Sequence, residues 1–259
     1  MQQLQTFELD TDRLAAGLRE VTAAFAGTVT GLDPHAPVPT CPEWRVRDLV
    51  GHIGQGHRWA AELVRTRAAA PVPDPLAAEP GAPEDWPEWL HGGAAALIGA
   101  LLIDTGPDTP VWSFLGEQPA KFWLRRMFAD TAVHLADAAL AAGRPFTIAP
   151  ALATETISEG LRLISSAGAA GLKPELGELR GDGETLQLRP ADAEPGWLIT
   201  REPGGVKWER RTADADVVVA APVSDLLLVF SRRITPDDPR LTITGDRALV
   251  DHWWARTAF

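Results

Sequence analysis

The period of the hydrophobic pattern changes once along this chain of 259 residues, and that change constrains the fold more than any other feature. Up to about residue 172, apolar residues recur every three or four positions in long segments, which is the period of helices that bury one face. We expect helices over about 13–27, 43–69, 84–103, 120–142 and 151–167. After Lys173-Pro174, short alternating or β-branched stretches are separated by Gly, Pro and Asp, a pattern typical of strands and turns.

Two domains are therefore expected, a helical bundle over residues 1–172 and a small α+β domain over residues 173–259. In the second domain we expect strands over about 185–189, 197–201, 206–210, 215–220 and 241–244, with helices over 222–230 and after Asp246. In the first domain, the proline-rich stretch 71–83 is expected to link two helices. The stretch 105–119 is expected to be a loop whose aromatic side chains line a cavity.

Composition excludes several classes of function. The formal net charge is −11, whereas binding to nucleic acid requires clusters of Lys and Arg. No apolar run approaches the ~20 residues of a membrane span, and the first residues lack the pattern of a signal peptide. Cys41 is the single cysteine, so no disulfide forms within the chain and a reducing cytoplasm is expected. We expect a monomer or a small homo-oligomer.

Three polar side chains fall on the apolar faces of two predicted helices. On the second helix, His52 follows Leu49 by three residues and shares its buried stripe. On the fourth helix, Asp130 and His134 lie one turn apart on the buried face, where a carboxylate and an imidazole both require partners. Two histidines and one carboxylate form the donor set of an open metal site, as in catalytic zinc centres and sites for other divalent ions.

Each of these residues also fits an arrangement without a metal. His52 is compatible with a core histidine that bonds to a carbonyl or a carboxylate, and Arg126 is spaced to neutralise Asp130 one turn later. Residues 40–43 have the pattern of a helix start, and we expect Cys41 within them to be a structural thiol. Neither a nucleotide-binding glycine motif nor a Gly-x-Ser-x-Gly nucleophile motif occurs in the chain.

Three segments resemble a known family. The sequence PTCPEWRVRDLVGHIGQGHRWAAEL, residues 39–63, resembles the first motif of the mycothiol-dependent maleylpyruvate isomerase family, part of the DinB-like superfamily. The sequence FWLRRMFADTAVHLADAALAAG, residues 122–143, resembles the second motif, and residues 215–254 resemble the small C-terminal domain. The resemblance implies a DinB-like four-helix bundle followed by a small α+β domain.

The resemblance also implies a site. It implies a divalent metal, with zinc as the first choice, held by His52, Asp130 and His134, and mycothiol as the thiol cosubstrate. It further implies an arginine of the C-terminal domain that binds a substrate carboxylate. Arg232 and Arg233 are the candidates, although surface charge at a helix end explains them equally well.

The chain departs from the family pattern beside this site. The second motif of the family has His-Glu where this chain has Ala129-Asp130, and it has arginine where this chain has Leu135. Aspartate is one methylene shorter than glutamate, so a metal would lie closer to the helix. Asp48 is a candidate for orienting His52, although helix capping or a salt bridge is equally compatible with its position.

Together these features predict an enzyme, a metal-dependent isomerase or S-transferase that uses mycothiol on a small electrophilic metabolite, unsaturated or carboxylated. Two alternatives remain on the same scaffold. One is a diverged protein that binds a metal or a small molecule, and the other is a metal-dependent enzyme that uses no thiol.

Overall fold

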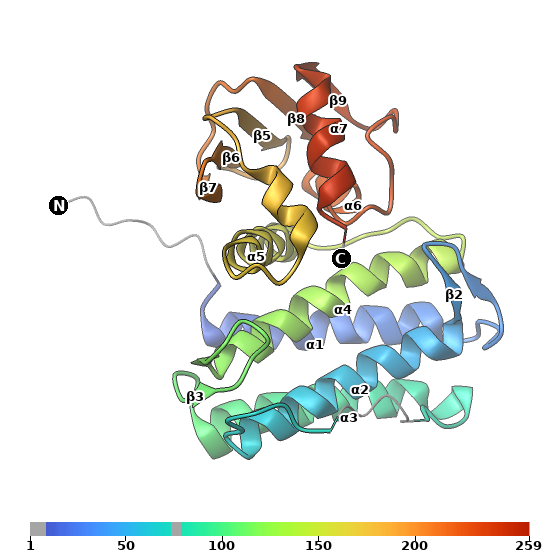
Figure 1. The fold of residues 1–259 in the computed structure, drawn as a ribbon. Coiled ribbons are helices and arrows are strands. Elements are labelled where there is room, and N and C mark those ends of the chain that lie inside the picture. Colours follow the sequence, from blue (N-terminus) through green and yellow to red (C-terminus); the bar gives the residue numbers. More distant parts are fainter. Residues whose placement is uncertain (1–8, 74–78, 259) are drawn as a thin grey trace. The chain divides into compact units, whose positions relative to one another are not determined.

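A computed structural model describes residues 9–73 and 79–258 of the chain, and Figure 1 shows its elements. Contacts divide the chain into a helical unit, Leu9–Ile148, and a sheet-containing unit that begins at Ala149. This division precedes the predicted boundary at residue 172 by one helix, because the helix over Pro150–Ala169 packs against elements of the sheet-containing unit. Within the described residues, no helix combines the length and the apolar character needed to cross a membrane.

The helical unit contains the four helices that the hydrophobic period predicts. Their bounds are Thr11–Val29 for α1, Val46–Arg65 for α2, Trp86–Gly99 for α3 and Lys121–Ala141 for α4. Each helix packs mainly against two others, since α1 and α2 both contact α3 and α4 (Figure 1). A 3-10 turn over Pro83–Asp85 precedes α3, and a π-helical turn over Ala100–Thr105 follows it. Residues 74–78 of the predicted linker lie outside the described residues.

Local signals explain where these helices begin. The Asp10 carboxylate accepts a hydrogen bond from the Arg13 backbone N–H at 2.8 Å, so Asp10 is the N-cap of α1 as its position suggests. The predicted helix start at residues 40–43 is wrong. Pro37–Val38 (β1) and Cys41–Arg45 (β2) pair as a short antiparallel hairpin instead, and α2 begins only at Val46. The Asp48 carboxylate fixes this later start by accepting the Arg45 backbone N–H.

Close packing of α2 on α3 depends on glycine. A Cβ atom on Gly54 of α2 would lie 1.9 Å from the ring of Trp89 on α3. A Cβ atom on Gly93 of α3 would lie 3.1 Å from the Gly54 carbonyl oxygen. The two helices also share Arg58, whose guanidinium donates to the carbonyl oxygens of Gly54 and Trp89 and stacks on the Trp89 ring. The α2 backbone is therefore held close to α3 along one face.

Two short bridged strands, Pro110–Val111 (β3) and Gln118–Pro119 (β4), lie inside the stretch that was expected to be a loop. Aromatic rings gather there as expected. Phe114 and Trp112 of this stretch pack against Trp123 of α4 at centroid distances of 6.0 and 6.1 Å. Trp123 is buried, and its indole N–H donates to the Trp112 carbonyl oxygen.

The sheet-containing unit has one five-stranded sheet in the order β7-β6-β5-β8-β9. The strands are Thr185–Pro190 (β5), Trp197–Glu202 (β6), Gly205–Arg210 (β7), Val217–Ala221 (β8) and Thr242–Gly245 (β9). Only β5 and β8 pair in parallel. The helices are Pro150–Ala169 (α5), Val223–Phe230 (α6) and Arg247–Arg256 (α7), and a 3-10 turn covers Pro174–Leu179. All five predicted strands are present within three residues of their expected bounds.

Candidate metal centre

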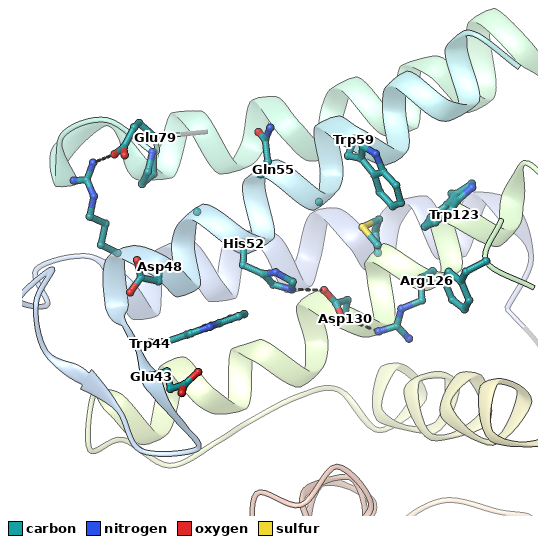
Figure 2. Close-up of a pocket in the computed structure, with 16 residues that line it drawn as sticks. Glu43, Trp44, Asp48, His52, Gln55, Trp59, Glu79, Trp123, Arg126 and Asp130 are labelled. Carbon is teal, nitrogen blue, oxygen red and sulfur yellow. Dashed lines mark hydrogen bonds and ion pairs between the residues drawn. The ribbon is translucent and has the colours of Figure 1, made fainter. Parts of the chain in front are cut away.

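The structure brings His52, Asp130 and His134 together between α2 and α4. The Nε2 atom of His52 lies 3.1 Å from the Oδ2 atom of Asp130 (Figure 2). One ligand atom from each of the three residues lies within 4.8 Å of the others. The His52 side chain is 37% exposed and that of His134 is 12% exposed, so solvent reaches the group from the His52 side.

Asp130 is held in its ionised form by its surroundings. Burial acts to raise the pKa of its carboxyl, but the Arg126 guanidinium, the hydrogen bond from His52 and the two nearby imidazoles outweigh this effect. The pKa of Asp130 is therefore well below its ordinary value. Arg126 donates to the Oδ1 atom of Asp130 at 2.7 Å, the pairing that the i,i+4 spacing suggested.

His134 has a second carboxylate on its other side. Its Nδ1 atom lies 2.7 Å from the Oδ2 atom of Asp137, one turn later on α4. Asp137 is completely buried and also accepts a hydrogen bond from the Thr40 hydroxyl, which lies between β1 and β2. The Cys41 thiol lies 4.0 Å from the Oδ2 atom of the same carboxylate.

Trp44 covers the two histidines. Its ring centroid lies 4.9 Å from that of His52 and 5.7 Å from that of His134. The rings of His52 and His134 meet edge to face at 4.9 Å. Because β2 carries Trp44, the hairpin restrains the orientation of both imidazoles and keeps water from one side of them.

A pocket of about 670 Å³ opens beside His52 and Asp130. In Figure 2, Trp44 lies on one side of the His52–Asp130 pair, while Trp59 and Trp123 lie on the other side. Phe114 also lines the pocket, as expected for the stretch that carries it. The lining is aromatic beside the candidate donors and acidic near the start of α2, where Glu43, Asp48 and Glu79 contribute.

The other predicted site residues are not among these three candidate ligands. The carboxylate of Asp48 lines the pocket, but its hydrogen bond caps α2 and does not involve His52. Arg232 and Arg233 belong to the sheet-containing unit, directly after α6. Arg232 has a left-handed backbone (φ 64°), and its guanidinium stacks on the Trp254 ring at 4.6 Å. Burial lowers the pKa of Arg232. Their role as substrate ligands stays a prediction.

Sequence reasoning missed three residues around the donors. Asp137 is three residues after His134, and this helical spacing is a visible signal for the contact. Thr40 and Trp44 had no such signal, because the hairpin that carries them was predicted as the start of a helix. Cys41, expected to be structural, shares a second group of possible ligands with His134 and Asp137.

The first group fits a divalent metal better than the second. It offers two imidazole nitrogens and one ionised carboxylate beside an open pocket, a donor set that leaves positions for other ligands. With Nδ1 of His134 in contact with Asp137, the Nε2 atom is the ring nitrogen that would bind a metal. In the second group, the Asp137 carboxylate already accepts hydrogen bonds from Thr40 and His134.

Comparison with known proteins identifies a family for the helical unit and a shared fold. Residues 15–139 match the family described as the mycothiol maleylpyruvate isomerase N-terminal domain. The crystal structure of the mycothiol-dependent maleylpyruvate isomerase matches with a TM-score of 0.58 and 14% identity, covering 92% of this chain and 95% of that chain. A histidine-to-alanine mutant of that enzyme matches with the same values. No curated protein sequence matches significantly.

The structural likeness at this low identity establishes a shared fold and confirms the predicted fold class. The family match lies over the four helices and includes all three candidate metal ligands. Over residues 15–139, the helical unit of this chain therefore matches the N-terminal domain of the mycothiol maleylpyruvate isomerase family.

Proposed function

We propose that this protein is a metal-dependent enzyme that uses mycothiol to isomerise a small electrophilic metabolite, or that joins the thiol to it as an S-transferase. The observation that carries the proposal is the group of His52, Asp130 and His134 beside a pocket, in a unit that matches this family. These three residues would hold the metal, and zinc suits the mixed nitrogen and oxygen donors. A divalent metal bound there lowers the pKa of a thiol ligand, so that a thiolate is available at neutral pH.

The side chains around the donors prepare the site for this chemistry. Asp130 stays ionised over the neutral range because its pKa is well below the ordinary value, so no proton has to leave it when a cation binds. Trp44 packs on both imidazoles and limits their rotation.

Isomerisation by a thiol needs no further reagent, because the thiolate is regenerated. The thiolate sulfur adds to one carbon of a conjugated double bond, and the π electron pair moves onto the conjugated carbonyl oxygen. The former double bond is then single and rotates. Return of the electron pair restores the double bond and expels the thiolate. A transferase would use the same nucleophile, but the substrate would lose a leaving group or open a ring.

The pocket suits a flat unsaturated carbon skeleton. Trp59, Trp123 and Phe114 offer aromatic faces and edges next to the candidate donors. Arg47 and Arg126 line the pocket but are paired with Glu79 and Asp130. A carboxylated substrate would therefore need a further cation, and Arg232 and Arg233 remain the proposed sources of one. Loss of affinity for carboxylated substrates, with unchanged metal content, is the expected result of replacing either arginine with Gln.

Metal content of the purified protein tests the proposal first. We expect one divalent ion per chain in the wild type. His52→Ala should weaken metal affinity by more than about 100-fold, the upper end of what loss of an outer partner costs, while the helical circular dichroism is retained. His35→Ala, which alters an exposed histidine, is the matched control and should bind metal as the wild type does. A wild type without stoichiometric metal would refute the proposal.

Calorimetry with mycothiol and with glutathione then tests the thiol. Binding of mycothiol that depends on the bound metal supports the proposal, and binding of neither thiol by the metal-loaded protein favours a thiol-independent metal enzyme.

A second candidate function is a metal-free protein that binds a small molecule in the same pocket. The contact between Arg126 and Asp130 favours it, because the carboxylate already has a cation within 2.7 Å. Metal content separates the two candidates. Arg126→Gln also separates them. If the protein is a metal enzyme, this substitution should strengthen metal binding, and if the protein binds no metal, it should only destabilise the fold.

A further inference from the structure

Asp137 has a buried carboxylate and is not one of the three proposed metal ligands. None of its surface is exposed, and its two oxygens are used differently. Oδ1 accepts the Thr40 hydroxyl hydrogen, whereas Oδ2 lies 2.7 Å from the Nδ1 atom of His134. A carboxylate buried so completely is costly unless its oxygens have partners. One partner comes from α4 itself, and the other is Thr40, which lies 97 positions before Asp137 in the sequence.

The contact with Asp137 bears on where His134 carries its proton. The Asp137 carboxylate accepts from the Thr40 hydroxyl and from the Cys41 thiol, and a carboxylate that also accepts from His134 requires a hydrogen on Nδ1. A neutral imidazole with a proton on Nδ1 has its lone pair on Nε2. In that form, His134 would offer its Nε2 atom to the group that it makes with His52 and Asp130.

We propose that Asp137 is a positioning residue that keeps His134 as the Nδ1–H tautomer and so presents its Nε2 lone pair to the candidate metal centre. The consequence for metal affinity rests on the proposed function, but the tautomer itself does not. The Thr40 hydrogen bond holds Asp137 in turn, so the hairpin and α4 together fix the ring. Carboxylate partners of this kind orient metal-binding histidines and raise their basicity.

A rival arrangement uses the same atoms differently. Cys41, His134 and Asp137 also lie close enough to share an ion, with Asp137 as a direct ligand. In that case His134 would use Nδ1, and the Nδ1 proton would be absent. Complete burial of Asp137 and its bond to Thr40 favour the positioning role, and Cys41→Ala distinguishes the two arrangements.

The first test measures the tautomer in the metal-free protein. Long-range ¹H–¹⁵N NMR of the full chain reports which ring nitrogen carries the proton, and His134→Gln identifies the His134 signals. We expect Nδ1–H in the wild type, a mixture of tautomers in Asp137→Ala, and an intermediate result in the nearly isosteric Asp137→Asn. A proton on Nε2 in the wild type would overturn the proposal. So would an unchanged Nδ1–H tautomer in Asp137→Ala.

The second test measures zinc and cobalt affinity by competition with a chelator. We expect Asp137→Ala to weaken affinity by about 10–100-fold, Asp137→Asn to weaken it less, and Cys41→Ala to leave it unchanged. Equal losses in Cys41→Ala and Asp137→Ala would assign the ion to the rival group and overturn the positioning role. If even the wild type binds no metal, the proposed function fails, and the NMR result alone decides the role of Asp137.

Discussion

His57 makes the helical unit sensitive to acid. It is almost completely buried on α2, and its Nε2 atom lies 2.8 Å from the Thr131 hydroxyl oxygen. That hydroxyl donates its own hydrogen to the Met127 carbonyl oxygen, so it must accept from His57. The Nε2 atom therefore carries the ring proton, and the buried Nδ1 atom has no hydrogen-bond partner among the described residues. Burial lowers the pKa of His57 to about 4.

This shift predicts a definite dependence of stability on pH. Between about pH 6.5 and pH 4 the unfolded chain binds a proton on His57 that the folded chain does not bind. The free energy of unfolding therefore has its full value, as far as His57 is concerned, above pH 6.5, and it decreases as the pH falls toward 4. The full loss is about 3.4 kcal/mol for a shift of about 2.5 pKa units, and about 2 kcal/mol is already lost at pH 5.

Urea unfolding of the wild type and of His57→Gln at pH 7.5 and pH 5, followed by circular dichroism, measures this loss. Glutamine can still donate to Thr131 but does not titrate, so the stability difference between the two proteins should narrow by about 2 kcal/mol at the lower pH. His91→Gln, which changes an exposed histidine on α3, is the control and should follow the wild type. Parallel loss of stability in the wild type and in His57→Gln would refute the reasoning.

Three further predictions concern packing and capping. Gly54→Ala should destabilise the helical unit by about 1–3 kcal/mol through overpacking. Gly27→Ala, with nothing within 4 Å of the new Cβ, should stabilise it by about 0.5–1 kcal/mol. Chemical denaturation measures both free energies of unfolding, and equal changes would contradict the close contact between α2 and α3. Asp10→Ala removes the N-cap of α1 and should cost about 1 kcal/mol, visible as a lower Tm that Asp10→Asn largely restores. Ser158→Ala leaves the buried indole N–H of Trp197 without its partner and should cost the sheet-containing unit about 1–3 kcal/mol; an unchanged free energy of unfolding would show that water replaces the hydroxyl.

Periodicity in the sequence predicted the helices of the bundle because each helix buries one continuous face. The prediction was wrong at residues 40–43, because the local pattern there fits the start of a helix as well as it fits a hairpin. Short-range contacts favour the hairpin there, since the Asp48 carboxylate bonds to the Arg45 N–H and β1 pairs with β2. The α5 helix was predicted correctly as a helix, but its assignment to a unit depends on contacts with α6 and β7 that no local pattern encodes.

The candidate site was predictable to a similar extent. The inward positions of His52, Asp130 and His134 followed from the helical period, but their meeting depends on how α2 packs beside α4. The contact between Asp137 and His134 was visible as an i,i+3 spacing. Its partner Thr40 was not, because a hydrogen bond between positions 97 apart leaves no trace in local sequence.

The hairpin at residues 37–45 gives this protein an unusual intolerance of changes in loop length. Surface turns generally accept inserted residues at little cost, since closing a slightly longer loop requires little extra entropy. Here the two residues between the strands include Thr40, whose hydroxyl reaches a buried carboxylate, and Trp44 on β2 covers both imidazoles. A single residue inserted between β1 and β2 would shift one of these contacts relative to the other. This two-residue turn is therefore a segment in which inserted or deleted residues would affect the candidate site directly.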